Sequence, residues 1–193
     1  MSRILIVYGT SDGHTAKIAE AIGETLRRKG AIVNVMDARR AIGRPESYDG
    51  IVVAASVHAG RYQRYVHRWV REHAASLQGK PTAFVSVCLA VLQNKTEVQQ
   101  HLTAILDRFF TETGWRPTLT KIVAGALLYT RYNWLKRWMM KRIVQKAGGD
   151  TDTSRDYEYT DWKDVRKFAV GFGQLVDSTA AAIVHPPSGA RVA

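Results

Sequence analysis

The stretch Ile4-Leu5-Ile6-Val7-Tyr8, followed after one glycine by Thr10-Ser11-Asp12-Gly13-His14-Thr15, decides the fold of this chain. The apolar run has no alternation of polar and apolar positions, which predicts a strand covered on both faces. Beyond the turn, Ile18, Ile22 and Leu26 recur at four-residue steps. This spacing predicts a helix with one face packed on the strand, and therefore a strand-turn-helix unit at the start of an α/β sheet.

The turn at residues 10–15 has the composition of a phosphate-binding loop. A helix that begins here leaves its first backbone N–H groups unpaired and directs the positive end of its dipole at the loop. The hydroxyls of Thr10, Ser11 and Thr15, with the N–H groups around Gly13, supply donors for one phosphate. The same residue types also build ordinary tight strand-to-helix turns, so both interpretations stay open.

Strand and helix patterns alternate along the rest of the chain, which predicts a parallel sheet with helices on both faces. Further strands are predicted over residues 31–37, 50–56, 82–88 and 121–127. Apolar spacing predicts helices over residues 63–77 and 98–109. A last helix is predicted to begin at Thr160, whose hydroxyl would cap it, and to end near Val176.

The chain has 193 residues, enough for one domain with a full core, and 46% of them are hydrophobic. We expect residues 1–178 to form a single domain with an insertion at 128–159, and residues 179–193 to be a disordered tail. The one cysteine, Cys88, excludes an internal disulfide, and its apolar surroundings favour a small core residue over a redox thiol. Because neither a spanning helix nor a signal peptide is recognisable, we expect a cytoplasmic protein.

The net charge of +11 implies attraction to an anionic partner. Residues 127–147 contain no acidic residue, and their basic side chains are interleaved with aromatic and aliphatic ones. The basic residues are Arg131, Lys136, Arg137, Lys141, Arg142 and Lys146. The aromatic and aliphatic residues are Tyr129, Tyr132, Trp134, Trp138, Met139, Met140, Ile143 and Val144. This composition is typical of a segment that lies on an anionic membrane surface, here 128–147. The alternative is a helix packed on its own domain. Nucleic acid is not expected, because no binding motif accompanies the segment.

In an open parallel sheet, ligands bind beyond the carboxyl ends of the strands, where the strand order reverses. Three predicted loops meet there, at residues 10–15, 56–62 and 89–95. The chain has neither the Gly-Lys-Ser/Thr of a P-loop nor three spaced glycines of a dinucleotide site, so a mononucleotide is the expected ligand. The histidines lack zinc-site spacing and no Ser/His/Asp arrangement is detectable, so no metal is predicted and the catalytic residues stay unknown.

The strand, hydroxyl-rich loop and helix, with five predicted parallel strands, resemble flavodoxin, which holds FMN at the switch point between strands one and three. The resemblance extends to Trp115-Arg116-Pro117, Ala124-Gly125-Ala126-Leu127, Tyr129-Thr130-Arg131-Tyr132-Asn133-Trp134, Gly148-Gly149-Asp150-Thr151-Asp152-Thr153 and Tyr159-Thr160-Asp161-Trp162. Together these segments look like the family of quinone-dependent protoporphyrinogen IX dehydrogenases of bacterial haem synthesis. The resemblance implies an α/β fold, a three-layer flavodoxin-like sandwich with a five-stranded parallel sheet in the order 2-1-3-4-5 and a basic aromatic insertion around strand five.

The same resemblance implies an FMN-dependent oxidoreductase that oxidises protoporphyrinogen IX to protoporphyrin IX, passes the electrons to menaquinone or ubiquinone, and associates peripherally with the inner face of the cell membrane. The residues it assigns to the cofactor are Thr10, Ser11, Asp12, Gly13, His14, Thr15, Ser56, Val57, His58, Ala59, Gly60, Cys88, Leu89 and Ala90. Candidate clamps for the two anionic propionates of the substrate are Arg61, Arg64, Arg131 and Arg137.

Three alternatives remain open at the level of sequence. A flavodoxin-like NAD(P)H:quinone reductase would share the fold and the flavin. A soluble electron carrier would too, but ordinary flavodoxins are acidic and lack this insertion. A basic module of the same fold that has lost its flavin would only bind partners. The oligomeric state is not predicted.

Overall fold

The computed structural model describes residues 1–41, 44–93, 95–131 and 152–184, together with positions 134, 138 and 145. Five parallel strands form one sheet in the order β2-β1-β3-β4-β5. The strands are β1 (Arg3–Gly9), β2 (Ile32–Asp37), β3 (Gly50–Ser56), β4 (Thr82–Val87) and β5 (Leu119–Val123). This order confirms the predicted fold class.

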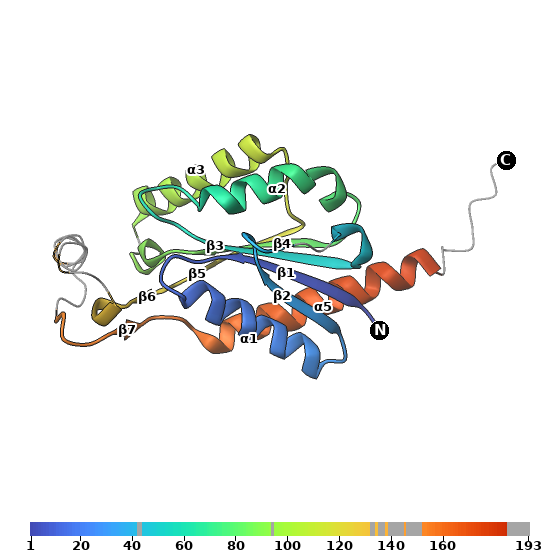
Figure 1. Cartoon of the computed structure of the whole chain (residues 1–193), viewed down its shortest axis with the longest axis horizontal. Helices are drawn as coiled ribbons and strands as arrows, with labels where there is room; N and C mark the ends of the chain where they lie inside the picture. The colour runs from blue at the N-terminus through green and yellow to red at the C-terminus, as the bar shows by residue number, and fades with distance from the viewer. Residues whose placement is uncertain are drawn as a thin grey trace.

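Helices cover both faces of the sheet, which gives three layers (Figure 1). One face carries α1 (His14–Arg28) and α5 (Trp162–Val184), and the other carries α2 (Arg64–Leu77) and α3 (Thr96–Thr113). Short 3-10 turns, η1 (Pro45–Ser47), η2 (Leu89–Leu92) and η3 (Tyr129–Arg131), lie in the connections. Every helix between neighbouring strands therefore returns the chain to the same edge, so the loops that leave the strands gather at one end of the molecule.

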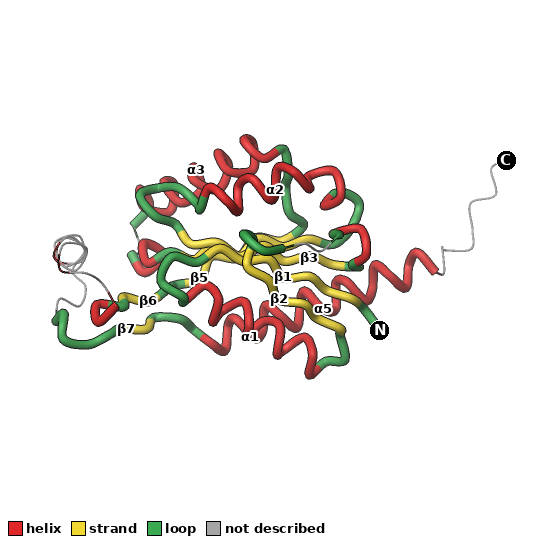
Figure 2. The backbone as a smooth tube through the Cα atoms, in the orientation of Figure 1, coloured by secondary structure: helices red, strands yellow, loops and turns green. Residues whose placement is uncertain are grey.

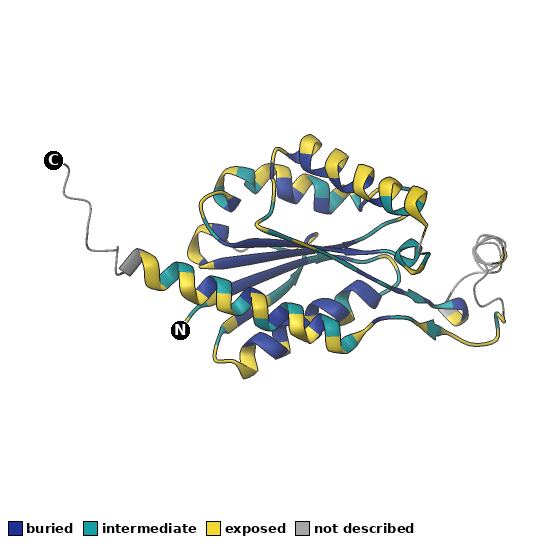
Figure 3. Ribbon diagram, turned by 180° about the vertical axis from the view of Figure 1, so that it is seen from behind, coloured by how far each residue is buried: buried dark blue, intermediate teal, exposed yellow. Residues whose placement is uncertain are grey.

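Alternate residues of the central strands enter two separate cores. In β1, Leu5 and Val7 pack in the core beneath α2 and α3, whereas Ile4 and Ile6 pack in the core beneath α1 and α5. Burial of each such side chain stabilises the fold by roughly 1.5–3 kcal/mol. Figure 3 shows the consequence, with buried strands between helices whose outer faces are exposed. Two-sided burial is the physical reason for apolar runs without alternation.

The fifth strand differs from its prediction over residues 121–127. The parallel strand β5 ends at Val123, and Ala126–Leu127 forms a separate strand, β6, which pairs antiparallel with β7 (Tyr157–Glu158). Between them, the carbonyl of Ala124 accepts a hydrogen bond from Thr160 Oγ1 at 2.7 Å and that of Gly125 accepts one from the Tyr159 N–H at 3.1 Å. The chain thus leaves β4 because its backbone groups find other partners, and the β6-β7 ribbon extends beyond the sheet (Figure 2).

The start of the last helix also differs from its prediction. Asp161, not Thr160, caps α5, because its Oδ1 accepts hydrogen bonds from the N–H groups of Lys163 at 2.9 Å and Asp164 at 3.0 Å. Both residue types are good caps, but the hydroxyl of Thr160 already donates to a carbonyl of the preceding connection. The cap therefore lies one residue later than predicted, and the helix itself begins at Trp162.

The end of α5 lies beyond the predicted end near Val176. The helix continues to Val184 through an alanine-rich turn at residues 180–182 that contains no helix breaker. Residues 179–184, predicted to be disordered, are thus helical, and the rest of the predicted tail, 185–193, lies outside the described residues. The long helix packs along α1, and its last turns extend beyond the sheet (Figure 1).

Candidate functional site

A cavity of about 250 Å³ opens at the carboxyl ends of the strands, where the three predicted loops meet. Most residues predicted to bind the cofactor line it: Thr10, Asp12, His14, Thr15, Ser56, Val57, His58, Ala59, Cys88, Leu89 and Ala90. Val87, Gly125 and Ala126, which are not among the predicted cofactor residues, complete the wall. The loops meet here because β1, β3 and β4 are adjacent and parallel, so their last residues share one edge of the sheet.

Three of the predicted residues do not line the cavity. Ser11 is exposed and its Oγ accepts a hydrogen bond from Gln63 Nε2 at 3.4 Å. Gly13, the residue just before α1, has a left-handed φ of 92° that residues with a side chain rarely adopt. Gly60 lines a neighbouring hollow on the other side of the second loop. Their places in the structure give them supporting roles in the two loops.

The first loop is fixed by hydrogen bonds that leave its donors directed at the cavity. The Gly13 N–H donates to Thr10 Oγ1 at 2.8 Å, so the hydroxyl hydrogen of Thr10 is available to a ligand. On the outer side, Tyr65 Oη accepts from the Thr10 N–H at 3.0 Å and donates to the Thr10 carbonyl at 3.1 Å. Tyr65 thus fastens the loop to α2, a role for which the sequence offered no signal.

Helix α1 presents its amino terminus to the same cavity. Its first residue is His14, no side chain caps it, and its first turn contains no acid. The helix dipole and the free N–H groups of this turn favour a bound anion. Buried Thr15 adds a hydroxyl, while the carboxylate of Asp12 also lines the cavity. The described lining residues include no lysine or arginine, so an anion held here would depend on hydroxyls and backbone N–H groups.

Buried His14 connects the loop to the start of α5. Its Nε2 lies 2.7 Å from Thr160 Oγ1, and the only hydroxyl hydrogen of Thr160 is donated to the Ala124 carbonyl. Nε2 is therefore the donor, which fixes the neutral tautomer with its proton on that nitrogen. Burial lowers the pKa of His14, partly opposed by the charge of Glu158 and reinforced by that of Lys17. The imidazole is accordingly neutral at pH 7.

This burial predicts a pH dependence of stability. Because the folded chain holds His14 at a lowered pKa, the unfolded chain binds a proton at His14 more readily than the folded chain does. The protein therefore keeps its full stability above the ordinary histidine pKa of about 6.5, and its stability falls as the pH falls below that value. We expect His14→Gln, which keeps a donor for Thr160, to lose less stability than the native chain between about pH 7.5 and about pH 5.5. Urea unfolding midpoints at both pH values measure it, and equal losses in the two proteins would contradict it.

The second loop is a tight two-residue turn. His58 and Arg61 exchange backbone hydrogen bonds of 2.8 and 3.0 Å, and the residues between them, Ala59 and Gly60, have φ of 48° and 71°. Both central residues with positive φ make this a type I′ turn, and the left-handed backbone of Ala59 costs roughly 1 kcal/mol or more. A strained residue at a cavity wall is typical of a loop selected for its shape.

Gln63 links the first and second loops. Its Nε2 donates to Ser56 Oγ at 2.6 Å and reaches Ser11 Oγ, and Ser56 Oγ also lies 3.1 Å from His58 Nε2. Among the described residues, the buried Oε1 of Gln63 has no hydrogen-bond partner. The side chain is therefore held from one end only, at the junction of the two loops.

Cys88 is half-buried and lines the cavity, so its predicted place in the core is only partly right. Burial raises the pKa of its thiol, and the backbone N–H groups of Ala90 and Val91 only partly offset this. The thiol therefore stays protonated at neutral pH, which agrees with the prediction against a redox thiol.

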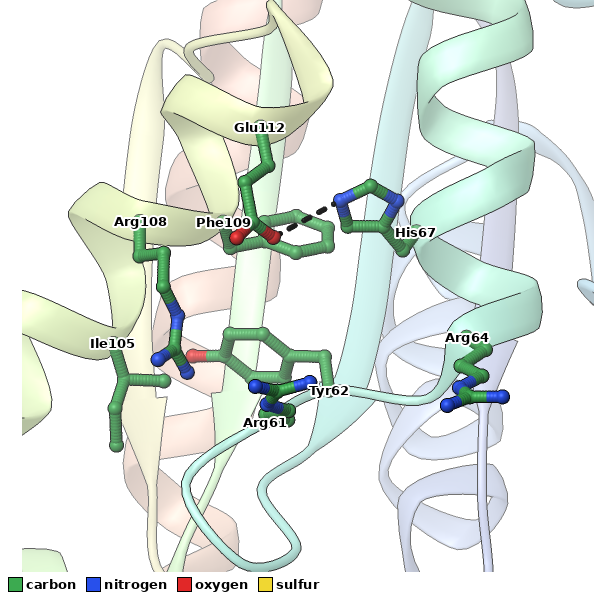
Figure 4. Close-up of a pocket in the computed structure, with 8 residues that line it drawn as sticks. All are labelled: Arg61, Tyr62, Arg64, His67, Ile105, Arg108, Phe109 and Glu112. Carbon is green, nitrogen blue, oxygen red and sulfur yellow. Dashed lines mark ion pairs between the residues drawn. The ribbon is translucent and has the colours of Figure 1, made fainter.

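The arginines predicted to bind substrate do not gather at this cavity. Arg61 and Arg64 line a separate cavity of about 220 Å³ between α2 and α3 (Figure 4). Arg131 is the last residue of η3, and Arg137 lies outside the described residues. Within the described ranges, no three potential metal-binding side chains cluster. No described helix combines the length and hydropathy needed to cross a bilayer.

Comparison with known proteins agrees with this geometry. A family model described as the flavodoxin domain matches residues 5–154. Two solved flavodoxins, one from the domain Archaea and flavodoxin 1 from Bacillus cereus, superpose with a TM-score of 0.56 each, at 16% and 18% identity. They cover 91% and 90% of this chain and 99% and 98% of their own chains. At such identities, this likeness concerns the fold alone.

Sequence relatives are more specific. The chain is 36% identical over 177 residues, 91% of its length, to a protein of Escherichia coli (strain K12) named protoporphyrinogen IX dehydrogenase (quinone), 97% of which is covered. The chain belongs to the quinone-dependent protoporphyrinogen IX dehydrogenase family. A family member named in the same way from Leishmania major is 32% identical over 178 residues, covering 90% of this chain and 75% of that protein. The family resemblance predicted from separated motifs is thereby confirmed.

Proposed function

We propose that the protein is an FMN-dependent oxidoreductase of haem biosynthesis that oxidises protoporphyrinogen IX to protoporphyrin IX and passes the electrons to a respiratory quinone. The observation that carries this proposal is the 36% identity to the E. coli protein named for that activity, which extends over 91% of the chain. A match of that extent makes shared substrate and acceptor the simplest account. The name of that relative does not state the cofactor, so FMN is argued from the cavity.

The loop cavity suits a mononucleotide with one phosphate. The hydroxyls of Thr10 and Thr15 and the first N–H groups of α1 offer donors for the phosphate without a cation. Val57, Leu89 and Ala90 provide apolar surface for a flat ring between the second and third loops. Bound there, FMN would supply the group that accepts a hydride and returns electrons to an acceptor.

The residues of the chain set the charge of part of the cavity wall and the relative position of its loops. Neutral His14 and the protonated thiol of Cys88 add no charge to the cavity wall. The hydrogen bonds of Tyr65 and Gln63 hold the first two loops in one relative placement.

The decisive experiment mixes FMN-loaded protein with protoporphyrinogen IX and a menaquinone analogue under anaerobic conditions and follows porphyrin fluorescence. We expect fast growth of fluorescence that depends on both protein and quinone, with protein-free and quinone-free mixtures as controls. Growth no faster than the protein-free control, with FMN bound, would overturn the proposed activity. Reduction of the bound flavin by NAD(P)H would then favour the alternative of an NAD(P)H:quinone reductase.

We infer also that the insertion holds the protein against the inner face of the cell membrane. Trp134 and Trp138, four positions apart as on one face of a helix, are 80% and 56% exposed, unusual values for so large an apolar residue. They lie in the basic segment 128–147, and anionic lipid attracts each nearby cation by about 1 kcal/mol. Exposed indole rings among cations are typical of interfacial attachment.

Sedimentation with vesicles tests this attachment. We expect the protein to bind vesicles that contain phosphatidylglycerol and not vesicles of phosphatidylcholine alone. Changing Trp134 and Trp138 together to Ser should release it, whereas Leu92→Ser, at an exposed apolar residue of η2, should not. Equal binding of the native protein and the double variant would contradict the assignment.

A further inference from the structure

Two hollows, distinct from the loop cavity, lie on the far side of the turn at residues 58–61. One, of about 220 Å³, lies between α2 and α3, and the other, of about 390 Å³, lies next to it along α3. Arg61, Ile105 and Arg108 line both, so the two hollows form one continuous depression. Arg108 is separated from the turn by more than 40 positions in the sequence, which explains why sequence reasoning did not place it here.

The depression has a positive end. Figure 4 shows the guanidinium groups of Arg61 and Arg108 directed at the same end, beside the ring of Tyr62. Arg108 Nη2 donates to the carbonyl of Gly60, which fixes it against the turn. In the part of the chain that the structure describes, no carboxylate forms an ion pair with either arginine. Glu112, the acid that lines this depression, lies at the other end, with its Oε2 3.2 Å from His67 Nε2.

The floor of the depression is apolar and rigid. Tyr62 and Phe109 are buried with ring centroids 4.9 Å apart, and Phe84 packs against both. The hydroxyl of Tyr62 is paired with Ser86 Oγ at 2.8 Å. Its polar group is thus already satisfied inside the core, so the floor presents ring carbons to a ligand. Two unpaired cations over such a floor suit an apolar molecule that carries carboxylates.

The turn connects this depression to the loop cavity. Ala59 lines both the loop cavity and the larger hollow, so the turn is a wall that the two share. A ligand that reacts in the loop cavity can therefore extend over the turn and place its side chains on the positive end. Protoporphyrinogen IX, an apolar macrocycle with two propionates, has that shape.

We propose that Arg61 and Arg108 form a clamp for the propionates of the tetrapyrrole, with the turn at residues 58–61 beneath the macrocycle. This inference rests on the proposed function. It assigns a binding role to Arg108, and it selects Arg61 from the arginines that the sequence suggested. Guanidinium groups bind carboxylates through paired hydrogen bonds, and here such bonds also remove the repulsion between two neighbouring cations.

Direct binding of the stable product tests the clamp without turnover. Affinity is measured on FMN-loaded protein from the change in porphyrin fluorescence, with protoporphyrin IX and with its dimethyl ester, which lacks the charges. We expect Arg108→Gln and Arg61→Gln each to weaken binding of the free acid about tenfold or more and to leave binding of the ester unchanged. Arg68→Gln, at an exposed arginine of α2 outside both hollows, is the matched control and should change neither.

The outcomes separate the clamp from the proposed function. A native protein that binds neither porphyrin would overturn both. A native protein that binds the free acid, with both clamp variants unchanged, would overturn the clamp and leave the function standing. Arg108 also supports the turn through its hydrogen bond to the Gly60 carbonyl, so Arg108→Gln removes both a cation and a support of the turn. Arg61→Gln keeps that hydrogen bond, so weaker binding of the free acid in this variant shows a lost clamp and not a displaced turn. If only Arg108→Gln has an effect, and on acid and ester alike, the clamp is wrong.

Discussion

Replacing Thr10 and Thr15 together by valine is expected to weaken FMN binding by at least about two orders of magnitude. A hydrogen bond to a charged group contributes about 1.5–3 kcal/mol, and the double variant removes two donors from the phosphate loop. Valine has nearly the shape of threonine, so buried Thr15 can be replaced without a cavity. Titration of FMN-free protein with FMN, followed by the quenching of flavin fluorescence, measures the loss.

Two controls isolate the hydroxyls. Changing both residues to serine keeps the donors and should retain most of the affinity. Thr25→Val removes a hydroxyl that bonds the Ala21 carbonyl within α1, away from the cavity, and should leave FMN binding unchanged. Thr10 Oγ1 also accepts from the Gly13 N–H, so part of the expected loss comes from a loosened turn. Native affinity in the valine variant would show that phosphate does not bind this loop.

The largest expected effect on stability is that of Gly9→Ala, at the last residue of β1. A methyl group at Gly9 would lie 2.3 Å from Val66 Cγ2 and 3.1 Å from Gln63 Oε1. The first distance is far below any real contact, and Val66 is fully buried on α2, so either the helix or the strand must shift. Overpacking of this kind costs about 1–3 kcal/mol. Urea unfolding of the variant and the native chain measures the difference in free energy.

The chain offers a matched glycine for this comparison. A methyl group at Gly171, inside α5, would meet nothing within 4 Å, so Gly171→Ala should stabilise the protein by up to about 1 kcal/mol through helix propensity. A double-mutant cycle with Val66→Ala adds a second test. The smaller side chain makes room for the methyl group, so the double variant should lose less free energy of unfolding than the two single variants lose in sum. Strict additivity would show that the two residues do not meet.

Much of the fold follows from the sequence because the strands are buried on both faces. The predicted strand at residues 50–56 coincides with β3, whose every position but the last is fully buried. The meeting of the loops after β1, β3 and β4 is also predictable, since parallel strands end at one edge. The very short strands β6 and β7 are not, because two residues carry no periodicity that a sequence can reveal.

The contacts that hold the site are less visible in sequence. Gln63 and Tyr65 lie at the start of an amphipathic helix, where polar side chains are usually solvated, yet both bind the loops. Thr160 and Asp161 are both residue types that cap helices, and Thr160 is excluded because its hydroxyl donates to the carbonyl of Ala124. Such choices depend on residues that are distant in sequence, which local patterns do not encode.

The β6-β7 ribbon makes the segment between its strands replaceable as a unit. Ala126 pairs with Glu158 and Leu127 pairs with Tyr157, so the segment leaves and rejoins the fold at neighbouring backbone positions. The entropy of closing such a loop rises only slowly with its length, by roughly 0.6 kcal/mol for each doubling. Evolution can therefore lengthen, shorten or exchange the part of this segment beyond Thr130 while the sheet keeps its geometry. Buried Tyr129 is the exception, because it belongs to the cluster against which Leu89 of the loop cavity packs.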